Sequence, residues 1–176
     1  MDWKEKLRVV RDFPKPGIGF IDITTLLADP AAFDAAVEAM IEPLRSRGVD
    51  KVVCIESRGF IFGAPAALRL GAGMVLLRKP GKLPAEKIRE EYALEYGVDA
   101  IEMHADAVRP GERVAVVDDL LATGGTAEAA TRLIEKAGGE VAGCGFMIGF
   151  TFLNAAEKLD KYDVFWLMQY DSEEET

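Results

Sequence analysis

The sequence predicts an α/β fold, in which a central and mostly parallel β-sheet is flanked by helices and carries a small hood or flap. Short apolar runs, typical of strands buried on both faces, alternate along the chain with segments of helical periodicity. The chain has 176 residues, enough to enclose a hydrophobic core. We therefore expect residues 1–176 to form a single domain, with a flap at about 79–108 and an acidic tail at 171–176.

The first segments predict two helices. A short amphipathic helix is expected at the N terminus, with one apolar face formed by Trp3, Leu7 and Val10. A longer helix begins after Asp29, a good N-cap residue, with Pro30 at its first position, and ends at Gly48. Because Pro43 lies inside this pattern, we expect a kink or a loosened last turn.

The remaining elements follow the same alternation. A strand is expected at 51–56, a helix at 59–71, strands at 73–78 and 112–119, a helix at 126–137, and strands at 141–150 and 163–168. Residues 87–108 break the rhythm, because they alternate weakly and have Gly97 at their middle. This segment predicts a hairpin or flap rather than a crossover helix.

Composition excludes several classes of protein. The net charge of −9 argues against a general nucleic-acid binder, and part of it lies in the tail, where we expect a solvated, frayed end. No apolar run approaches the length of a membrane span, and the first residues lack a signal-peptide pattern. Cys54 and Cys144 lie inside apolar runs, which favours buried free thiols and a cytoplasmic location over a disulfide. A lone His104 gives no transition-metal spacing.

Positive charge is concentrated in one segment. Within twelve positions lie Arg78, Lys79, Lys82, Lys87 and Arg89. Two interpretations fit this pattern: a solvated loop, or the binding site of a small polyanion.

The segment VVDDLLATGGT, residues 116–126, predicts a binding site at the end of a strand. Its Gly- and Thr-rich loop precedes a helix, and such a loop binds phosphate through backbone amides and the helix dipole. It matches neither a Walker A loop nor a dinucleotide fingerprint. The carboxylates of Asp118 and Asp119 suit sugar hydroxyls or the waters around Mg²⁺. A ribose 5-phosphate would satisfy both halves, whereas the alternative is an ordinary acidic turn.

The same string resembles the phosphoribosyl pyrophosphate (PRPP) motif of type I phosphoribosyltransferases. More narrowly, the chain resembles the adenine phosphoribosyltransferase family over nearly its whole length. Five segments match in the family's order and spacing: DFPKPGIGFIDITTLLADP (12–30), ESRGFIFGAP (56–65), LLRKPGKLP (76–84), YALEYG (92–97) and VVDDLLATGGT (116–126). Five matches in register are far more specific than any one of them.

The resemblance implies a reaction and a set of roles. Adenine and PRPP, with Mg²⁺ on PRPP, would give AMP and pyrophosphate in a cytoplasmic homodimer that binds neither nucleic acid nor membranes. Asp118 and Asp119 would hold the ribose hydroxyls, and Mg²⁺ indirectly. The 5′-phosphate would bind Ala122, Thr123, Gly124, Gly125 and Thr126. Pyrophosphate would bind Glu56, Ser57, Arg58, Arg78, Lys79 and Lys82.

Two further groups come from the resemblance. Adenine would stack on Phe20 beside Gly19, hydrogen-bond the main chain of Ile21, and meet Leu120 and Leu121 on its other side. Glu95 and Tyr96, on the flap, and Arg58 would be catalytic. From the residues alone, Phe20 is more often a core aromatic than a base platform, and a solvated carboxylate is the alternative for Glu95.

One departure concerns the base. The family usually has Arg at the position of Ile21, so a contact made by that side chain would be lost, whereas main-chain recognition of adenine would remain. Two alternatives therefore stay open. One is a phosphoribosyltransferase for another nucleobase. The other is a non-catalytic regulator that senses PRPP, which the acidic composition and the absence of an appended DNA-binding segment disfavour.

Overall fold

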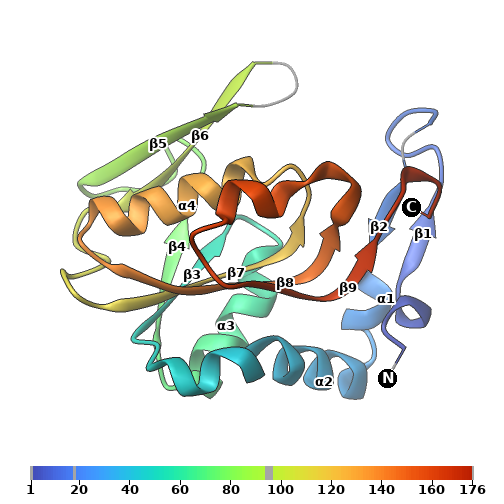
Figure 1. The fold of residues 1–176 in the computed structure, drawn as a ribbon, viewed down its shortest axis with the longest axis horizontal. Helices are drawn as coiled ribbons and strands as arrows, with labels where there is room; N and C mark the ends of the chain where they lie inside the picture. The colour runs from blue at the N-terminus through green and yellow to red at the C-terminus, as the bar shows by residue number, and fades with distance from the viewer. Residues whose placement is uncertain (1, 18, 94–96, 176) are drawn as a thin grey trace.

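The computed structural model describes residues 2–17, 19–93 and 97–175, and within them the chain forms a central five-stranded sheet with helices on both faces (Figure 1). The sheet has the strand order β4-β3-β7-β8-β9, and each neighbouring pair is parallel. Its strands are β3 (Lys51–Ile55), β4 (Gly73–Leu77), β7 (Arg113–Leu121), β8 (Glu140–Phe150) and β9 (Val164–Tyr170). The predicted α/β class is confirmed.

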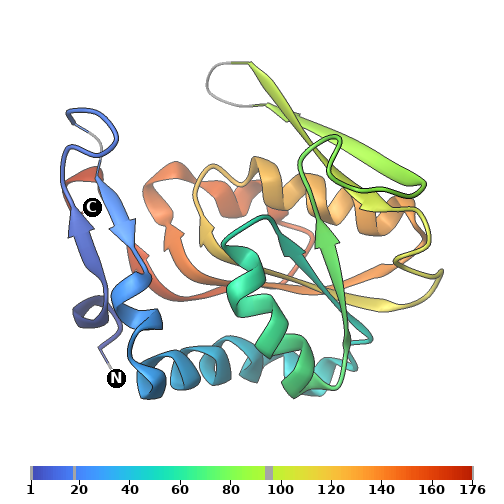
Figure 2. The same cartoon turned by 180° about the vertical axis from the view of Figure 1, so that it is seen from behind.

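Helices cover the two faces of this sheet unequally. The α-helices are α1 (Thr24–Leu27), α2 (Pro30–Ile41), α3 (Gly59–Leu70) and α4 (Gly125–Lys136). Helix α4 lies on one face, and α2 and α3 lie on the other, as both views show (Figures 1 and 2). Successive residues of β7 divide between the two cores: Val114 and Val116 pack on the α4 side, and Ala115 and Val117 on the α2/α3 side. Both faces are buried, which explains the continuous apolar run that ends at the acids.

Two antiparallel hairpins lie outside the sheet. They are β1 (Arg8–Val10) with β2 (Phe20–Asp22), and β5 (Lys87–Ala93) with β6 (Val98–His104). The second hairpin lies over α4 (Figure 2). Glu90 of β5 joins the two, because its carboxylate accepts hydrogen bonds from Nε of Arg132 at 3.3 Å and Nζ of Lys136 at 3.0 Å. The hairpin predicted within residues 87–108 is confirmed.

The N-terminal helix prediction is wrong. A 3₁₀ turn covers only Lys4–Lys6 (η1), and the chain then enters β1, where Val10 is paired with Phe20. The spacing of Trp3, Leu7 and Val10 suits a helix, but so short a helix is marginal without partners. Pairing with β2 instead gives the backbone a ladder of hydrogen bonds.

The features predicted for α2 are confirmed. Asp29 accepts hydrogen bonds from the amides of Ala31 and Ala32, both at 3.1 Å, and thereby caps the helix. The α-helix ends at Ile41, and the chain continues around Pro43 as a 3₁₀ helix, Glu42–Arg47 (η2). Proline removes a helical donor, so the tighter turn is the expected response.

The acidic tail differs from the frayed end that composition predicts. The chain forms a 3₁₀ turn at Glu173–Glu175 (η5), and Glu175 accepts a hydrogen bond from Nζ of Lys4 at 2.9 Å. The same ammonium lies 4.5 Å from the centroid of the Tyr170 ring. A cation from the N-terminal turn thus holds the tail against β9.

Both cysteines are buried and free, as predicted. Burial raises the pKa of each thiol to about 12, so neither is a ready thiolate. Among the described residues, no helix combines the length and apolar character that crossing a bilayer requires.

Candidate active site

The strand order creates one place where two neighbouring loops diverge. From β3 the chain crosses through α3 to β4 at the edge, and it later returns to β7 on the other side of β3. In parallel sheets the crevice at such a reversal, beyond the carboxyl ends of the strands, is the usual ligand site. Here the two ends are the loop 56–58 after β3 and the acids at the end of β7. Between them lies a cavity of about 210 Å³, lined by Ile55, Glu56, Ser57, Arg58, Lys79, Asp118, Asp119, Leu120 and Thr126.

The two acids of this cavity are in different environments. The Asp119 side chain is buried, and its Oδ2 lies 2.7 Å from Nε of Arg58, yet it accepts no well-aligned hydrogen bond from the described residues. Burial raises the pKa of Asp119, and the guanidinium opposes that rise. Burial and the Asp119 carboxylate raise the pKa of Asp118 well above its usual range. Two neighbouring buried carboxylates of this kind are suited to bind hydroxyl groups, which donate hydrogen bonds, or a cation.

Asp118 also depends on a residue that sequence analysis missed. Its Oδ1 accepts the amide of Asp119 at 2.9 Å and lies 2.6 Å from where a Cβ on Gly59 would stand. Gly59 is the first residue of α3. Only glycine lets the helix start approach this carboxylate so closely. The signal in the sequence was a glycine directly after Arg58.

The loop 122–126 forms a second cavity of about 90 Å³, which shares Asp118, Leu120 and Thr126 with the first. Gly124 has φ +78°, and a Cβ there would lie 2.9 Å from the carbonyl oxygen of Ala155. The loop is also held by Lys158, whose ammonium donates to the carbonyl of Thr123 at 2.7 Å. Gly124 brings no capping side chain to α4, so the first amides of the helix are open to an anion.

On the β3 side of the cavity, Glu56 binds three of the cationic residues that the sequence singled out. Its side chain is only 7% exposed, and Oε2 accepts from Nε of Arg78 at 2.9 Å and from the amide of Lys79, while Oε1 accepts from Nζ of Lys82. Burial raises the pKa of Glu56, but these hydrogen bonds outweigh burial and hold it below its usual value. Glu56 is thus an ionised anchor for positive charge.

Lys79 joins this group to the β5–β6 hairpin. Its ammonium donates to the hydroxyl of Tyr92 at 2.5 Å and to the carboxylate of Asp99. Burial lowers the pKa of Lys79, but Asp99 and Tyr92 together raise it above its usual value. The cation is therefore fixed at the wall of the cavity.

The residues predicted to bind a base are only partly brought together. The Phe20 ring lies beside the cavity, with Cζ of Arg58 5.7 Å from its centroid, and Gly19 precedes it. Ile21 is 5% exposed and packs in the α2/α3 core, so its side chain is not open to a ligand. Leu120 lines the 210 Å³ cavity.

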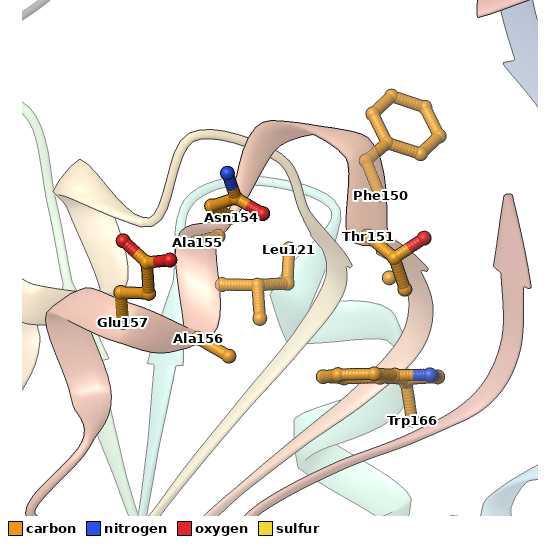
Figure 3. Close-up of a pocket in the computed structure, with 9 residues that line it drawn as sticks. Leu121, Phe150, Thr151, Asn154, Ala155, Ala156, Glu157 and Trp166 are labelled. Carbon is orange, nitrogen blue, oxygen red and sulfur yellow. The ribbon is translucent and has the colours of Figure 1, made fainter. Parts of the chain in front are cut away.

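Leu121 points to the other face of β7. There it lines a separate apolar cavity of about 140 Å³ together with Thr151, Asn154 and Trp166. Figure 3 shows the Trp166 indole lying flat below Leu121. Leu121 also borders the loop 122–126. It therefore packs beneath this loop and does not line the larger cavity with Leu120.

Two predicted catalytic residues, Glu95 and Tyr96, lie outside the described residues. Across the described part of the chain, no group of three or more His, Cys, Asp or Glu side chains could hold a metal ion by itself. Asp118 and Asp119 still offer oxygen ligands, and Mg²⁺ commonly binds through one or two carboxylates plus substrate phosphates.

Comparison with known proteins places this geometry in context. A family model described as a phosphoribosyl transferase domain matches residues 22–173. An adenine phosphoribosyltransferase of Desulfitobacterium hafniense is 54% identical over 170 residues, covering 97% of this chain and 98% of the relative. The crystal structure of adenine phosphoribosyltransferase from Thermoanaerobacter pseudethanolicus has a TM-score of 0.92 at 50% identity, covering 95% of this chain and 97% of that one.

A more distant structure contains ligands. Adenine phosphoribosyltransferase from Saccharomyces cerevisiae, complexed with an imino-altritol bisphosphate and adenine, has a TM-score of 0.88 at 38% identity, covering 93% of this chain and 95% of that one. The similarity to these two structures therefore extends over more than nine-tenths of the chain.

Proposed function

The chain belongs to the adenine phosphoribosyltransferase family, and we propose that its reaction takes place in the cavity between the ends of β3 and β7. The chain transfers the 5-phosphoribosyl group of PRPP to adenine, giving AMP and pyrophosphate, a step of purine salvage. One observation carries the placement of the site: the acidic cavity and the cavity of the loop 122–126 share Asp118, Leu120 and Thr126. A sugar and its phosphate can thus be bound as one molecule.

The PRPP half of the site uses the end of β7. Asp118 and Asp119 accept hydrogen bonds from the ribose hydroxyls. Burial raises the pKa of both carboxyls, and such shifted pKa values are common at functional sites. The 5′-phosphate binds the backbone amides and hydroxyls of the loop 122–126. Arg58 balances the charge of Asp119 and faces the departing pyrophosphate.

The pyrophosphate half uses the loop 56–58 and the cations after β4. Arg78, Lys79 and Lys82 bind the leaving group, on which negative charge builds as its bond to C1′ breaks. Glu56 does not face the anion, since its carboxylate is already bound to these cations. Its role is to hold them in place before the substrate arrives, and Ser57 completes the loop.

The site would take PRPP together with Mg²⁺. Asp118 and Asp119 are the residues that would hold it, directly or through water, and Oδ2 of Asp119, which pairs with Arg58 but accepts no well-aligned hydrogen bond from the described residues, fits that role. When bound, Mg²⁺ supplies positive charge to the pyrophosphate oxygens. The protein's own cations and acids orient the two ends of the substrate.

Adenine binds between Phe20 and Leu120, with the main chain of Ile21 reading its edge. The burial of the Ile21 side chain supports main-chain rather than side-chain recognition. Glu95 and Tyr96 would close over the bound substrates. Excluding water protects the positively charged ribosyl group from hydrolysis, and Glu95 would place the base or take its proton.

Three broader features complete the proposal. The chain acts as a single domain that forms a homodimer, supported by exposed apolar side chains on α3 and the edge strand β4, namely Leu68, Met74 and Leu76. Light scattering of the purified protein tests this assembly. Two free, buried thiols favour a reducing compartment such as the cytoplasm.

The decisive experiment is AMP formation by purified protein with Mg²⁺ and PRPP, offering adenine, hypoxanthine and guanine separately. We expect product from adenine alone. Product from another base would keep the PRPP site but move the base specificity. No product from any base, with PRPP still bound, would support a PRPP-sensing regulator instead.

A further inference from the structure

Tyr92 of β5 touches both ends of the proposed substrate site. Its side chain is 6% exposed and packs against Gly125, where a Cβ would lie 3.3 Å from Cδ2 of the Tyr92 ring. Gly125 belongs to the loop 122–126 and begins α4. At its other end, the Tyr92 hydroxyl lies 2.5 Å from Nζ of Lys79. One ring therefore separates the phosphate loop from a cation of the pyrophosphate side.

The contact with Lys79 is a hydrogen bond to the hydroxyl rather than a contact with the ring face. Nζ is 2.5 Å from the hydroxyl oxygen but 5.2 Å from the ring centroid. An ammonium above the ring would be about equally far from both, so this one lies beyond the hydroxyl, near the ring plane. Removing the hydroxyl removes the interaction, and the packing of the ring on Gly125 remains.

The hydroxyl is part of a closed triangle. Tyr92 donates to Oδ2 of Asp99 at 3.1 Å, and Lys79 donates to both. An ammonium has three N–H donors, and the triangle occupies two of them. The third has no hydrogen-bond partner among the described residues, and Lys79 lines the cavity together with Thr126 and Asp118.

We propose that Tyr92 is a positioning residue that sets the spacing between the phosphate loop and the Lys79 ammonium. This inference rests on the proposed function, which assigns the two ends of PRPP to these two places. PRPP carries a phosphate at one end of its ribose and a pyrophosphate at the other, so it must meet both at a fixed separation. AMP carries only the first group and does not need the spacing.

The test compares PRPP with AMP in a Tyr92→Phe variant. We expect KM for PRPP to rise about tenfold, the usual loss for one hydrogen bond to a charged group, and the dissociation constant of AMP to stay within about twofold. The matched control is Tyr162→Phe. The Tyr162 hydroxyl also donates to a charged group, Glu135, at 2.7 Å, but neither residue lines the cavity. That variant should leave KM for PRPP unchanged.

A second variant keeps the proposal falsifiable if Tyr92→Phe folds poorly. Asp99→Asn removes the carboxylate charge from the triangle, and by itself it should raise KM for PRPP while the dissociation constant of AMP stays within about twofold. Where both variants fold, its effect should not add to that of Tyr92→Phe, because both release the same ammonium. An unchanged KM for PRPP in Tyr92→Phe, an equal loss of PRPP and AMP affinity, or full additivity with Asp99→Asn would overturn the inference. Failure of the proposed function has a different signature, since the unmodified protein would then form no AMP from adenine.

Discussion

Replacing Glu56 by glutamine should destabilise the folded protein by about 2 kcal/mol, although the side chain keeps its shape. Glutamine has one acceptor oxygen. Placed at Oε2 it retains the bonds from Arg78 and Lys79, but its amide group then faces the ammonium of Lys82. A change of one atom thus tests whether this carboxylate is the anchor of the cation cluster.

The magnitude follows from the exposure of the two cations. A hydrogen bond to a charged group contributes about 1.5–3 kcal/mol. Lys82 is 49% exposed, so water replaces much of its lost partner and we assign about 1 kcal/mol to that bond. Arg78 is 30% exposed and exchanges a charged acceptor for a neutral one, which costs about 1 kcal/mol more. Burial offsets part of this, but the lowered pKa of Glu56 shows that the ionised form is favoured overall.

The assay is urea and thermal unfolding followed by circular dichroism. A loss of about 2 kcal/mol corresponds to a fall in Tm of about 4–8 °C for a chain of this size. Glu38→Gln is the matched control, because Glu38 also pairs with two arginines but is 44% exposed. It should cost less than about 1 kcal/mol. Equal effects of the two substitutions would refute the reasoning.

The pH dependence gives an independent check of the same reasoning. The pKa of Glu56 in the folded protein lies below its ordinary value of 4.5. Its contribution to stability is therefore present above that value and is lost as pH falls through the folded pKa. The stability difference between the unmodified protein and Glu56→Gln should be largest near neutrality and shrink in acid. A difference that does not vary with pH would contradict an ionised Glu56.

Four further predictions concern the site and its support. Asp118→Asn and Asp119→Asn should each lower kcat/KM for PRPP by about 100-fold, and near-normal turnover in the double variant would exclude the ribose assignment. The pKa of Asp118 is raised in the folded protein, so the stability that its protonated form contributes is present in acid and is lost as pH rises. Between about pH 4 and about pH 8, the free energy of unfolding should therefore fall less for Asp118→Asn than for the unmodified protein. Gly63→Ala would place Cβ 2.0 Å from Sγ of Cys54 and should cost about 3 kcal/mol, only part of which Cys54→Ala should restore in the double variant, because Cβ of residue 54 would still lie 2.9 Å away; additive unfolding energies would contradict this. Ile21→Arg buries a guanidinium at a 5% exposed position, so it should lower stability by about 3 kcal/mol or more without improving adenine turnover; faster turnover would mean that the side chain, not the main chain, reads the base.

The elements nearest the site could be predicted from local sequence because their signals are local. The apolar run that ends at Asp118 and Asp119, the glycines of the loop 122–126 and the helical pattern after them each indicate their own structure. The hairpin around Gly97 was readable for the same reason. The N-terminal segment was not, because Val10 becomes part of a strand only through its partner Phe20, ten residues away.

The contacts between residues of the site were harder to predict from the sequence than which residues belong to it. The resemblance predicted a pyrophosphate-binding role for Glu56, but only the fold shows that Arg78 and Lys82 converge on it from beyond the neighbouring strand. The strand pleat likewise turns Leu121 away from Leu120. Tyr92 gave no local signal, since its two contacts come from segments that are distant along the chain.

The position of β7 at the centre of the sheet also has a consequence for local unfolding. This strand has a hydrogen-bonded neighbour on each side and a packed core on each face, whereas β4 is an edge strand and the β5–β6 hairpin lies outside the sheet. Amides of the central strand should therefore exchange with deuterium only when the whole domain opens, while those near Lys79 should exchange through smaller fluctuations. The acids proposed to bind the sugar are therefore expected on the slowest-exchanging part of the molecule, and the cations proposed to bind the leaving group on a part that should open independently.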